Sequence, residues 1–190
     1  MARPHDPQRR EELLEGAVDY VVANGISNLS LRPLAEALDT QAPVLLHHFG
    51  SKQHLIEELL RRIRDRVRAL GRTAEATTHR SGLAAVWAWV SNPAQEQLMT
   101  LFFETYGLAL RDPDRYADFL QHAVRDWLDE PLAAVDEISA TLALATITGL
   151  LLDLLTTGDQ ARVQHAMARF TLLLHQHADQ TASQSDGPPA

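Results

Sequence analysis

Cysteine is absent from this chain of 190 residues, and its absence excludes disulfide bridges and thiolate metal sites. A protein without disulfides suits a reducing compartment, so we expect a cytoplasmic location. Residues 1–10 are polar and lack the apolar stretch of a secretory signal. We find no internal repeat and no long segment that alternates with the period of a β-strand. Because no segment has the period of a β-strand, the predicted fold class is all-α.

The chain also lacks an uninterrupted hydrophobic run. Its most apolar segment, residues 138–155, contains Ser139, Thr141 and Thr146, and Asp153 adds a charge near its end. A membrane-spanning helix needs about 20 predominantly apolar residues. We therefore expect a helix buried in protein, and no membrane association.

Positive charge is scarce in most of the chain. Residues 73–190 carry 6 Lys and Arg against 15 Asp and Glu, whereas residues 1–72 carry 11 against 10, and the net charge is −8. Only the first part can therefore lie against a polyanion without repulsion. The overall acidity argues against unspecific binding to nucleic acid.

Capping residues and breaks divide the chain into about nine helices. Asp6-Pro7 is an N-cap followed by proline at the first helical position, and Gly25 is a typical C-terminal stop. Ser30 caps a second helix, and Asp39-Thr40 is a turn in which Thr40 caps a third. The later helices are expected near residues 52–70, 82–90, 93–110, 113–129, 132–157 and 160–178.

Residues 30–54 have the pattern of two short helices joined by a tight turn, with a third helix behind them. This arrangement presents the second of these two short helices, the one that Thr40 caps, to the major groove of DNA. The outward side of that helix is expected to carry Thr40, Gln41, Ala42, Val44 and His47. Gln41 can hydrogen-bond adenine, and Ala42 or Val44 can contact a thymine methyl group. The alternative is that these are ordinary solvated residues of a helical bundle.

Particular residues of this region resemble the TetR family of transcriptional regulators. The resemblance covers about residues 9–58, and beyond residue 70 only the helical architecture is similar. It rests on Leu13-Leu14 with Ala17, on Gly25, on Ser30-Leu31, on Leu34-Ala35, and on His48-Phe49-x-Ser-Lys-x-x-Leu ending at Leu55. The resemblance implies that DNA phosphates are held by Ser30, Arg32 and Lys52. Lys52 would be assisted by the dipole at the N-terminus of the helix that it begins.

Three residues depart from the family pattern. Asp39 stands at the usual turn glycine, Pro43 at a frequent second glycine, and Leu46 at a tyrosine that commonly touches phosphate. Aspartate can adopt a left-handed conformation, so the turn should survive. Loss of the tyrosine hydroxyl removes one phosphate contact, although His47 beside it can supply a donor.

The resemblance also implies a larger domain that binds a small effector in a cavity. The candidate ligand-binding residues are Trp87, Met99, Phe102, Phe103, Tyr106 and Trp127. The alternative is that these side chains fill a core. Glu104 and Asp153 are lone acids in apolar surroundings, and each either lines a pocket for a cationic ligand or lies at the surface and caps a partner.

The last two helices carry more apolar surface than one sensor domain is expected to cover. An isologous four-helix interface between two copies would bury this surface. The predicted dimer contact comprises Leu151, Leu154, Leu155, Val163, Met167, Phe170 and Leu174. A two-fold axis there would require a nearly palindromic operator.

We therefore predict a helix-turn-helix domain at residues 1–52, a ligand-binding and dimerisation domain at residues 53–179, and a disordered tail at residues 180–190. The expected protein is a ligand-responsive regulator, a repressor, that binds operator DNA as a homodimer. The alternative is a helical bundle that binds a small molecule or protein and has lost DNA recognition.

An enzyme is not expected, because the sequence contains no nucleophile elbow, phosphate loop or His-Glu metal helix. Asp118, His122 and Asp126 recur at spacings of four, which is a possible metal-binding geometry. Tyr116, with Leu120, Ala123 and Trp127, defines the expected buried face of that helix, so those polar groups lie outside. We expect no metal and no cofactor.

Overall fold

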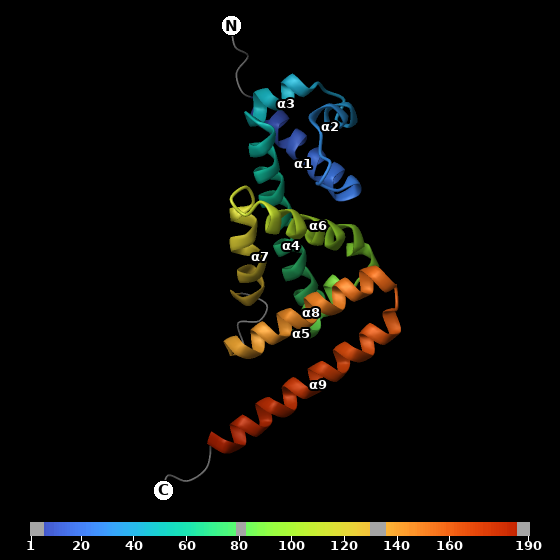
Figure 1. Ribbon diagram of the computed structural model, residues 1–190, viewed down its shortest axis with the longest axis vertical. Coiled ribbons are helices and arrows are strands. Elements are labelled where there is room, and N and C mark those ends of the chain that lie inside the picture. Colours follow the sequence, from blue (N-terminus) through green and yellow to red (C-terminus); the bar gives the residue numbers. More distant parts are fainter. Residues whose placement is uncertain (1–5, 79–82, 130–135, 186–190) are drawn as a thin grey trace. The chain divides into compact units, whose positions relative to one another are not determined.

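The computed structural model describes residues 6–78, 83–129 and 136–185 (Figure 1). Side chains of residues 70–78, 127–129, 175 and 177–185 lie outside this description. The described residues form helices and no strand, which confirms the predicted all-α class. The elements are α1 (Pro7–Asn24), α2 (Leu31–Ala37), α3 (Ala42–Phe49), α4 (Lys52–Thr78), α5 (Leu83–Val90), the 3-10 helix η1 (Pro93–Gln95), α6 (Glu96–Arg111), α7 (Ala117–Asp129), α8 (Glu137–Thr157) and α9 (Gln160–Ser185).

These helices belong to two compact units. The first comprises Met1–Thr73 and Ala94–Ala123, and therefore joins α1 to α3 with most of α4, with α6 and with the start of α7. The second comprises Ala74–Pro93 and Val124–Ala190, which include α5, α8 and α9. The domain limits at residues 52 and 179 stay a prediction.

The ends of α1 are fixed as the sequence predicts. The Asp6 carboxylate accepts hydrogen bonds from the amides of Gln8 at 3.1 Å and Arg9 at 3.2 Å, and Pro7 is the first helical residue. These bonds satisfy donors that have no partner inside the helix. Gly25 ends the helix at φ +80°, a conformation that glycine adopts without steric cost.

Apolar residues at helical spacing form the core of the first unit. Leu34, Leu45 and Leu55 are fully buried, and Phe49 at the end of α3 is 2% exposed. The buried face of α1 consists of Leu13, Leu14, Ala17, Val18 and Val21. This core packs α1 against α2 and anchors α2 on α3, so the short helices are held by burial rather than by intrinsic helix propensity.

Two helices are longer than predicted. α4 continues to Thr78 instead of ending near residue 70, and α9 continues to Ser185 instead of residue 178. Both extensions are polar but contain no proline and no glycine beyond Gly71, so nothing in them forces a break. The expectation of disorder for 180–190 is therefore corrected for residues 180–185, and residues 186–190 lie outside the described residues.

Two other helices begin later than predicted. Residues 113–116 form turns, and α7 begins at Ala117 rather than at Pro113. α8 begins at Glu137 behind Asp136, whose carboxylate accepts hydrogen bonds from the amides of Ile138 and Ser139. In both cases a capping residue or a proline correctly indicated that a helix begins nearby, but not which residue is the first in the helix.

In the second unit α8 contacts both α5 and α9. Ala140 and Ala143 are buried on one face of α8, and Leu83, Leu144, Phe170 and Leu174 pack against them. Gly158, at φ +68°, ends α8 in the left-handed conformation and begins the turn into α9.

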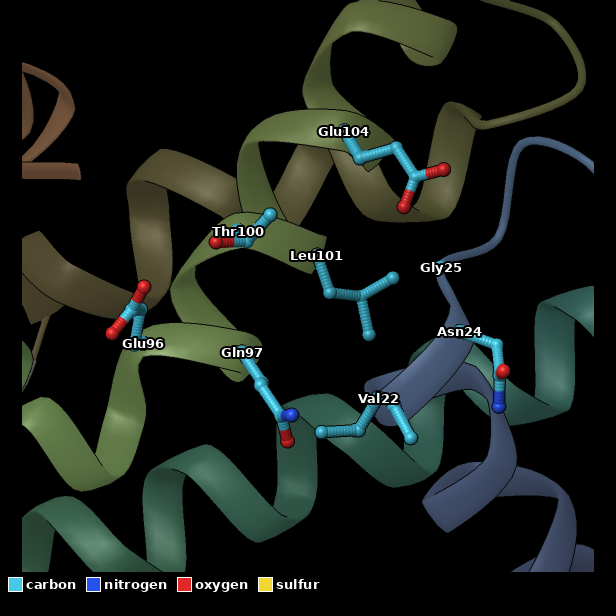
Figure 2. Close-up of a pocket in the computed structure, with 9 residues that line it drawn as sticks. Val22, Asn24, Gly25, Glu96, Gln97, Thr100, Leu101 and Glu104 are labelled. Atoms are coloured by element: carbon cyan, nitrogen blue, oxygen red, sulfur yellow. The ribbon is translucent and has the colours of Figure 1, made fainter. Parts of the chain in front are cut away.

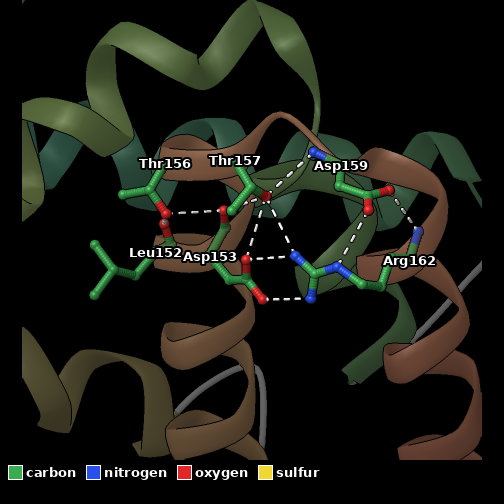
Figure 3. Close-up of polar contacts among 6 residues, drawn as sticks. All are labelled: Leu152, Asp153, Thr156, Thr157, Asp159 and Arg162. Atoms are coloured by element: carbon green, nitrogen blue, oxygen red, sulfur yellow. Dashed lines mark hydrogen bonds and ion pairs between the residues drawn. The ribbon is translucent and has the colours of Figure 1, made fainter.

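A surface ion-pair network closes that turn (Figure 3). The Arg162 guanidinium donates to both Asp153 carboxylate oxygens, at 2.6 and 2.7 Å, and to Asp159 at 3.2 Å. Its hydrogen bond to Asp153 is the main reason that the pKa of Arg162 is raised. Asp153 therefore has the structural role that was one of its two predicted alternatives.

The apolar segment 138–155 is buried on one face only. Among the described helices, α8 alone is long and apolar enough by length and composition to cross a membrane, and 22% of its most apolar window is buried. Ile138, Leu142 and Leu152 are 75%, 53% and 47% exposed. The expectation of a helix buried in protein therefore holds for one side of α8 within a single chain.

Candidate nucleic-acid interface

The turn between α2 and α3 has the geometry expected of a helix-turn-helix. Asp39 lies at φ +48°, in the left-handed region, where a short polar side chain is tolerated. The Thr40 amide then donates to the Ala35 carbonyl at 2.9 Å. Aspartate in place of the usual glycine thus leaves the turn intact, as predicted.

The third helix begins one residue later than its predicted cap. Gln41, not Thr40, occupies the N-cap of α3, and Pro43 lies in the first turn, where its missing amide proton costs nothing. Neither Ser30 nor Gln41 makes a side-chain capping bond. Ser30 therefore marks the start of α2 by position alone.

Most of the predicted DNA-binding side chains lie at the surface. The side chains of Leu45 and Phe49 are buried in the core, so the other side of α3 faces outward. Thr40, Ala42 and Val44 are half-buried in the chain. The exposed members of the predicted set are Ser30, Arg32, Gln41, His47 and Lys52.

Two of the predicted phosphate ligands have neighbours that matter for binding. Arg32 pairs with Glu36 at 3.2 Å, but both side chains are mostly exposed, so this pair is weak and can yield to phosphate. Lys52 is the first residue of α4, and the Ser51 hydroxyl accepts the amide of His54 at 3.0 Å. The N-terminus of α4 is thus ordered beside the lysine.

Two arginines of α4 are engaged by the acidic face of α1. Arg62 pairs with Glu11 and Glu15, and Arg66 pairs with Glu15 at 2.7 Å and with Asp19 at 2.8 Å. The hydrogen bond to Asp19 outweighs burial and raises the pKa of Arg66. These side chains tie α1 to α4 and are therefore occupied in the isolated chain.

A partly buried ion pair that the sequence did not reveal lies at the other end of α1. Arg10 donates to both Glu58 carboxylate oxygens at 2.5 Å, and its guanidinium lies 5.0 Å from the centre of the Phe49 ring. Glu58 is only 8% exposed. An acid between the buried residues Leu55 and Leu59 of α4 was the available signal.

The predicted ligand-binding residues fall into both units. Phe102, Phe103 and Tyr106 of α6 form an aromatic cluster with Phe119 of α7, with ring centres 5.4 to 6.0 Å apart. Met99 is 4% exposed in the same unit. Trp87 is 6% exposed in the second unit, and its indole N–H is buried with no hydrogen-bond partner among the described residues. The side chain of Trp127 lies outside the described residues.

A pocket of about 350 Å³ lies between the end of α1 and the start of α6 (Figure 2). Gln97, Thr100, Leu101 and Glu104 line it from α6, and none of the predicted ligand-binding residues does. The Glu104 carboxylate accepts the amides of Ile26 at 3.0 Å and Ser27 at 2.7 Å. Burial alone would raise the pKa of Glu104, but the hydrogen bonds from Ser27 and Ile26 together lower it.

Three of the predicted dimer residues are buried within a single chain and offer no surface to a partner. Leu151, Val163 and Met167 are 4%, 0% and 3% exposed. The predicted residues Leu154, Leu155, Phe170 and Leu174 are half-buried. The strongly exposed apolar side chains of α8 and α9 are instead Ile138, Leu142, Leu152, Leu172 and Leu173. α8 is apolar on nearly all sides, so its sequence does not reveal which side meets its own chain.

The metal-binding geometry considered for α7 is occupied by other contacts. Asp118 pairs with Arg64 at 3.3 Å, and the His122 ring nitrogen Nδ1 lies 2.7 Å from the carbonyl oxygen of Asp118. Among the described residues, no group of three His, Cys, Asp or Glu is able to hold a metal ion.

Comparison with known proteins relates this arrangement to bacterial regulators. Residues 13–59 match the family of bacterial regulatory proteins called the tetR family. A transcriptional regulator from Streptomyces coelicolor A3(2) is 24% identical with a TM-score of 0.67, covering 87% of this chain and 99% of that chain. A TetR-family transcriptional regulator from Rhodococcus sp. is 19% identical with a TM-score of 0.65, covering 90% and 98%. The multidrug binding protein EbrR, complexed with ethidium, is 23% identical with a TM-score of 0.66, covering 87% and 99%. No curated protein sequence matches this chain.

Proposed function

We propose that this chain is a ligand-responsive repressor of the tetR family that binds a palindromic operator as a homodimer, because residues 13–59 match the family of bacterial regulatory proteins of that name. The role in transcriptional regulation rests on this match. The repressor role, the operator symmetry, the dimer and the effector are our proposals.

The exposed side of α3 carries the DNA-binding proposal. Gln41 and His47 stand clear of the core beside half-buried Val44, and these side chains would read base edges in the major groove. Ser30, Arg32 and Lys52 are exposed around them and would hold phosphates. Arg62 and Arg66 of α4 are engaged by α1 and are not part of this set.

The exposed apolar side of α8 and α9 supports the dimer. Leu142 and Leu152 on α8 and Leu173 on α9 are 53%, 47% and 49% exposed, and a second copy would bury them by two-fold symmetry. Large exposed apolar side chains gathered on neighbouring helices commonly mark a protein interface. The proposed contact therefore uses the outer side of the helices rather than Leu151, Val163 and Met167.

The aromatic cluster on α6 and α7 is the proposed effector contact. Phe102, Phe103 and Tyr106 are half-buried and offer flat apolar surfaces to a small molecule. The solved structure of EbrR with ethidium shows that a protein of this fold takes up a planar aromatic ligand. An effector that prefers one conformation of α6 would lower operator affinity by the difference in its affinity for the two states.

Fluorescence anisotropy with DNA from the region upstream of the gene tests the proposed function. Tight, salt-sensitive binding that requires a palindrome supports it, with a scrambled fragment of equal composition as the control. Equal affinity for both fragments, or no binding at low salt, would contradict it and favour a helical bundle that has lost DNA recognition.

A further inference from the structure

Two backbone amides in the loop after α1 are held by a side chain of α6. If α1 continued, the amides of Ile26 and Ser27 would donate to the carbonyls four residues earlier. Gly25 turns the chain away, and the two amides donate instead to the two carboxylate oxygens of Glu104. The carboxylate thus supplies these two amides with acceptors in place of helix carbonyls, in charge-assisted hydrogen bonds.

Gly25 is required for this contact by space as well as by conformation. A Cβ atom at this position would lie 2.8 Å from Oε2 and 3.0 Å from Oε1 of Glu104. Such distances are shorter than van der Waals contact, so a side chain here would displace the carboxylate. The glycine and the glutamate therefore fit one another across distant parts of the sequence.

The loop held by Glu104 leads directly into the helix-turn-helix. Ile26 and Leu29 are 3% and 4% exposed, and the Leu29 amide donates to the Ile26 carbonyl at 3.1 Å. Ser30 follows at once and begins α2. A loop anchored in the core at both ends is too short to absorb a displacement, so movement of its amides would move α2.

Glu104 also lies on the helix that carries the aromatic cluster. At 100° per residue, Phe102 and Tyr106 share one side of α6, and Glu104 lies on roughly the opposite side. A rigid helix that shifts in response to contacts on one side carries the other side with it. α6 therefore links those rings on one side to the loop that Glu104 holds on the other side.

We propose that Glu104 is a positioning residue that couples α6 to the DNA-binding helices through the amides of Ile26 and Ser27. The coupling rests on the proposed function, because its purpose is to link effector contacts on α6 to α2 and α3. By reciprocity, DNA held by α3 also stabilises α6, and this second direction is measurable without knowledge of the effector.

Hydrogen exchange with and without the upstream DNA fragment tests this coupling. In the full-length wild-type protein, DNA slows amide exchange in α3 and also in α6. In Glu104→Gln, which replaces the ion by a neutral amide, the slowing in α3 remains and the slowing in α6 is lost. Glu96→Gln is the matched control, because Glu96 lines the same pocket from α6 and is exposed.

Gly25→Ala breaks the same contact from the loop side and should give the same loss, which guards against an effect of the glutamine itself. Persistent slowing in α6 in both variants would overturn the coupling while the proposed function stands. A purely structural role for Glu104 predicts faster exchange in both variants without DNA but an unchanged response of α6 to DNA. Failure of the wild-type protein to bind the fragment contradicts the proposed function instead.

Discussion

Replacing Gly25 with alanine should destabilise the chain for two separable reasons. At φ +80° and ψ 171° the backbone is in a region that residues with a Cβ rarely enter, which costs about 1–3 kcal/mol. The new Cβ also displaces Glu104 from two hydrogen bonds, each worth about 1.5–3 kcal/mol when an ion takes part. Because Glu104 is only partly buried, we count about half of the sum of the two bonds, about 1.5–3 kcal/mol, and the total cost is then about 2.5–6 kcal/mol.

Urea denaturation followed by circular dichroism, in a double-mutant cycle with Glu104→Ala, separates the two reasons. With Glu104 removed, Gly25→Ala keeps only its backbone cost, so the coupling free energy should be about 1.5–3 kcal/mol. Gly158→Ala is a reference for positive φ in the left-handed α region, because Gly158 lies at φ +68° and ψ 3° and no atom lies within 4 Å of the added Cβ. Its backbone cost is smaller than that of Gly25→Ala, because the region at φ +80° and ψ 171° is adopted almost only by glycine.

Two results would refute this reasoning. The first is a coupling free energy within about 0.5 kcal/mol of zero, which is the range expected for independent sites. The second is a cost for Gly25→Ala no greater than that for Gly158→Ala. Either result would mean that the carboxylate moves aside at no cost and that its contact with the loop is not tight.

Three further predictions concern the DNA face, the dimer and the pH dependence. Lys52→Ala should weaken operator binding and reduce the slope of log affinity against log salt by about 1, whereas Lys52→Arg keeps the slope; an unchanged slope for Lys52→Ala would exclude a phosphate contact. Leu152→Lys should shift the sedimentation coefficient from dimer to monomer, and a dimer that survives it would place the interface elsewhere. The pKa of Glu104 is lower in the folded chain than its ordinary value of 4.5, so its stabilising effect is complete above that value and is lost as the pH falls through the folded pKa. The difference in unfolding free energy between wild type and Glu104→Gln should therefore shrink on acidification below about pH 4.5, and a constant difference from pH 7 to pH 3 would be against it.

The sequence predicted best where a local signal decides the structure. Asp6 and Gly25 mark the two ends of α1 as predicted, because an N-cap and a glycine stop act through nearby backbone groups. The turn at Asp39 also formed as predicted.

Features that depend on distant partners were not accessible from the sequence. Glu104 and Glu58 are acids in apolar surroundings, and only the structure pairs them with the loop at Ile26 and with Arg10. The inner side of α8 was misassigned because a helix that is apolar all round has no periodicity to mark its inside. Helix ends at Thr78 and Ser185 were missed because polarity without a breaker does not end a helix.

The proposed function requires that α3 enters the major groove in both halves of a dimer. Dimethyl sulfate protection on the upstream DNA tests it most directly, because the reagent methylates guanine N7, which lies in the major groove. We expect two protected patches on one face of the duplex, about 10 base pairs apart or a multiple of that spacing. Binding that leaves guanine N7 fully reactive, or that protects a single patch, would contradict it.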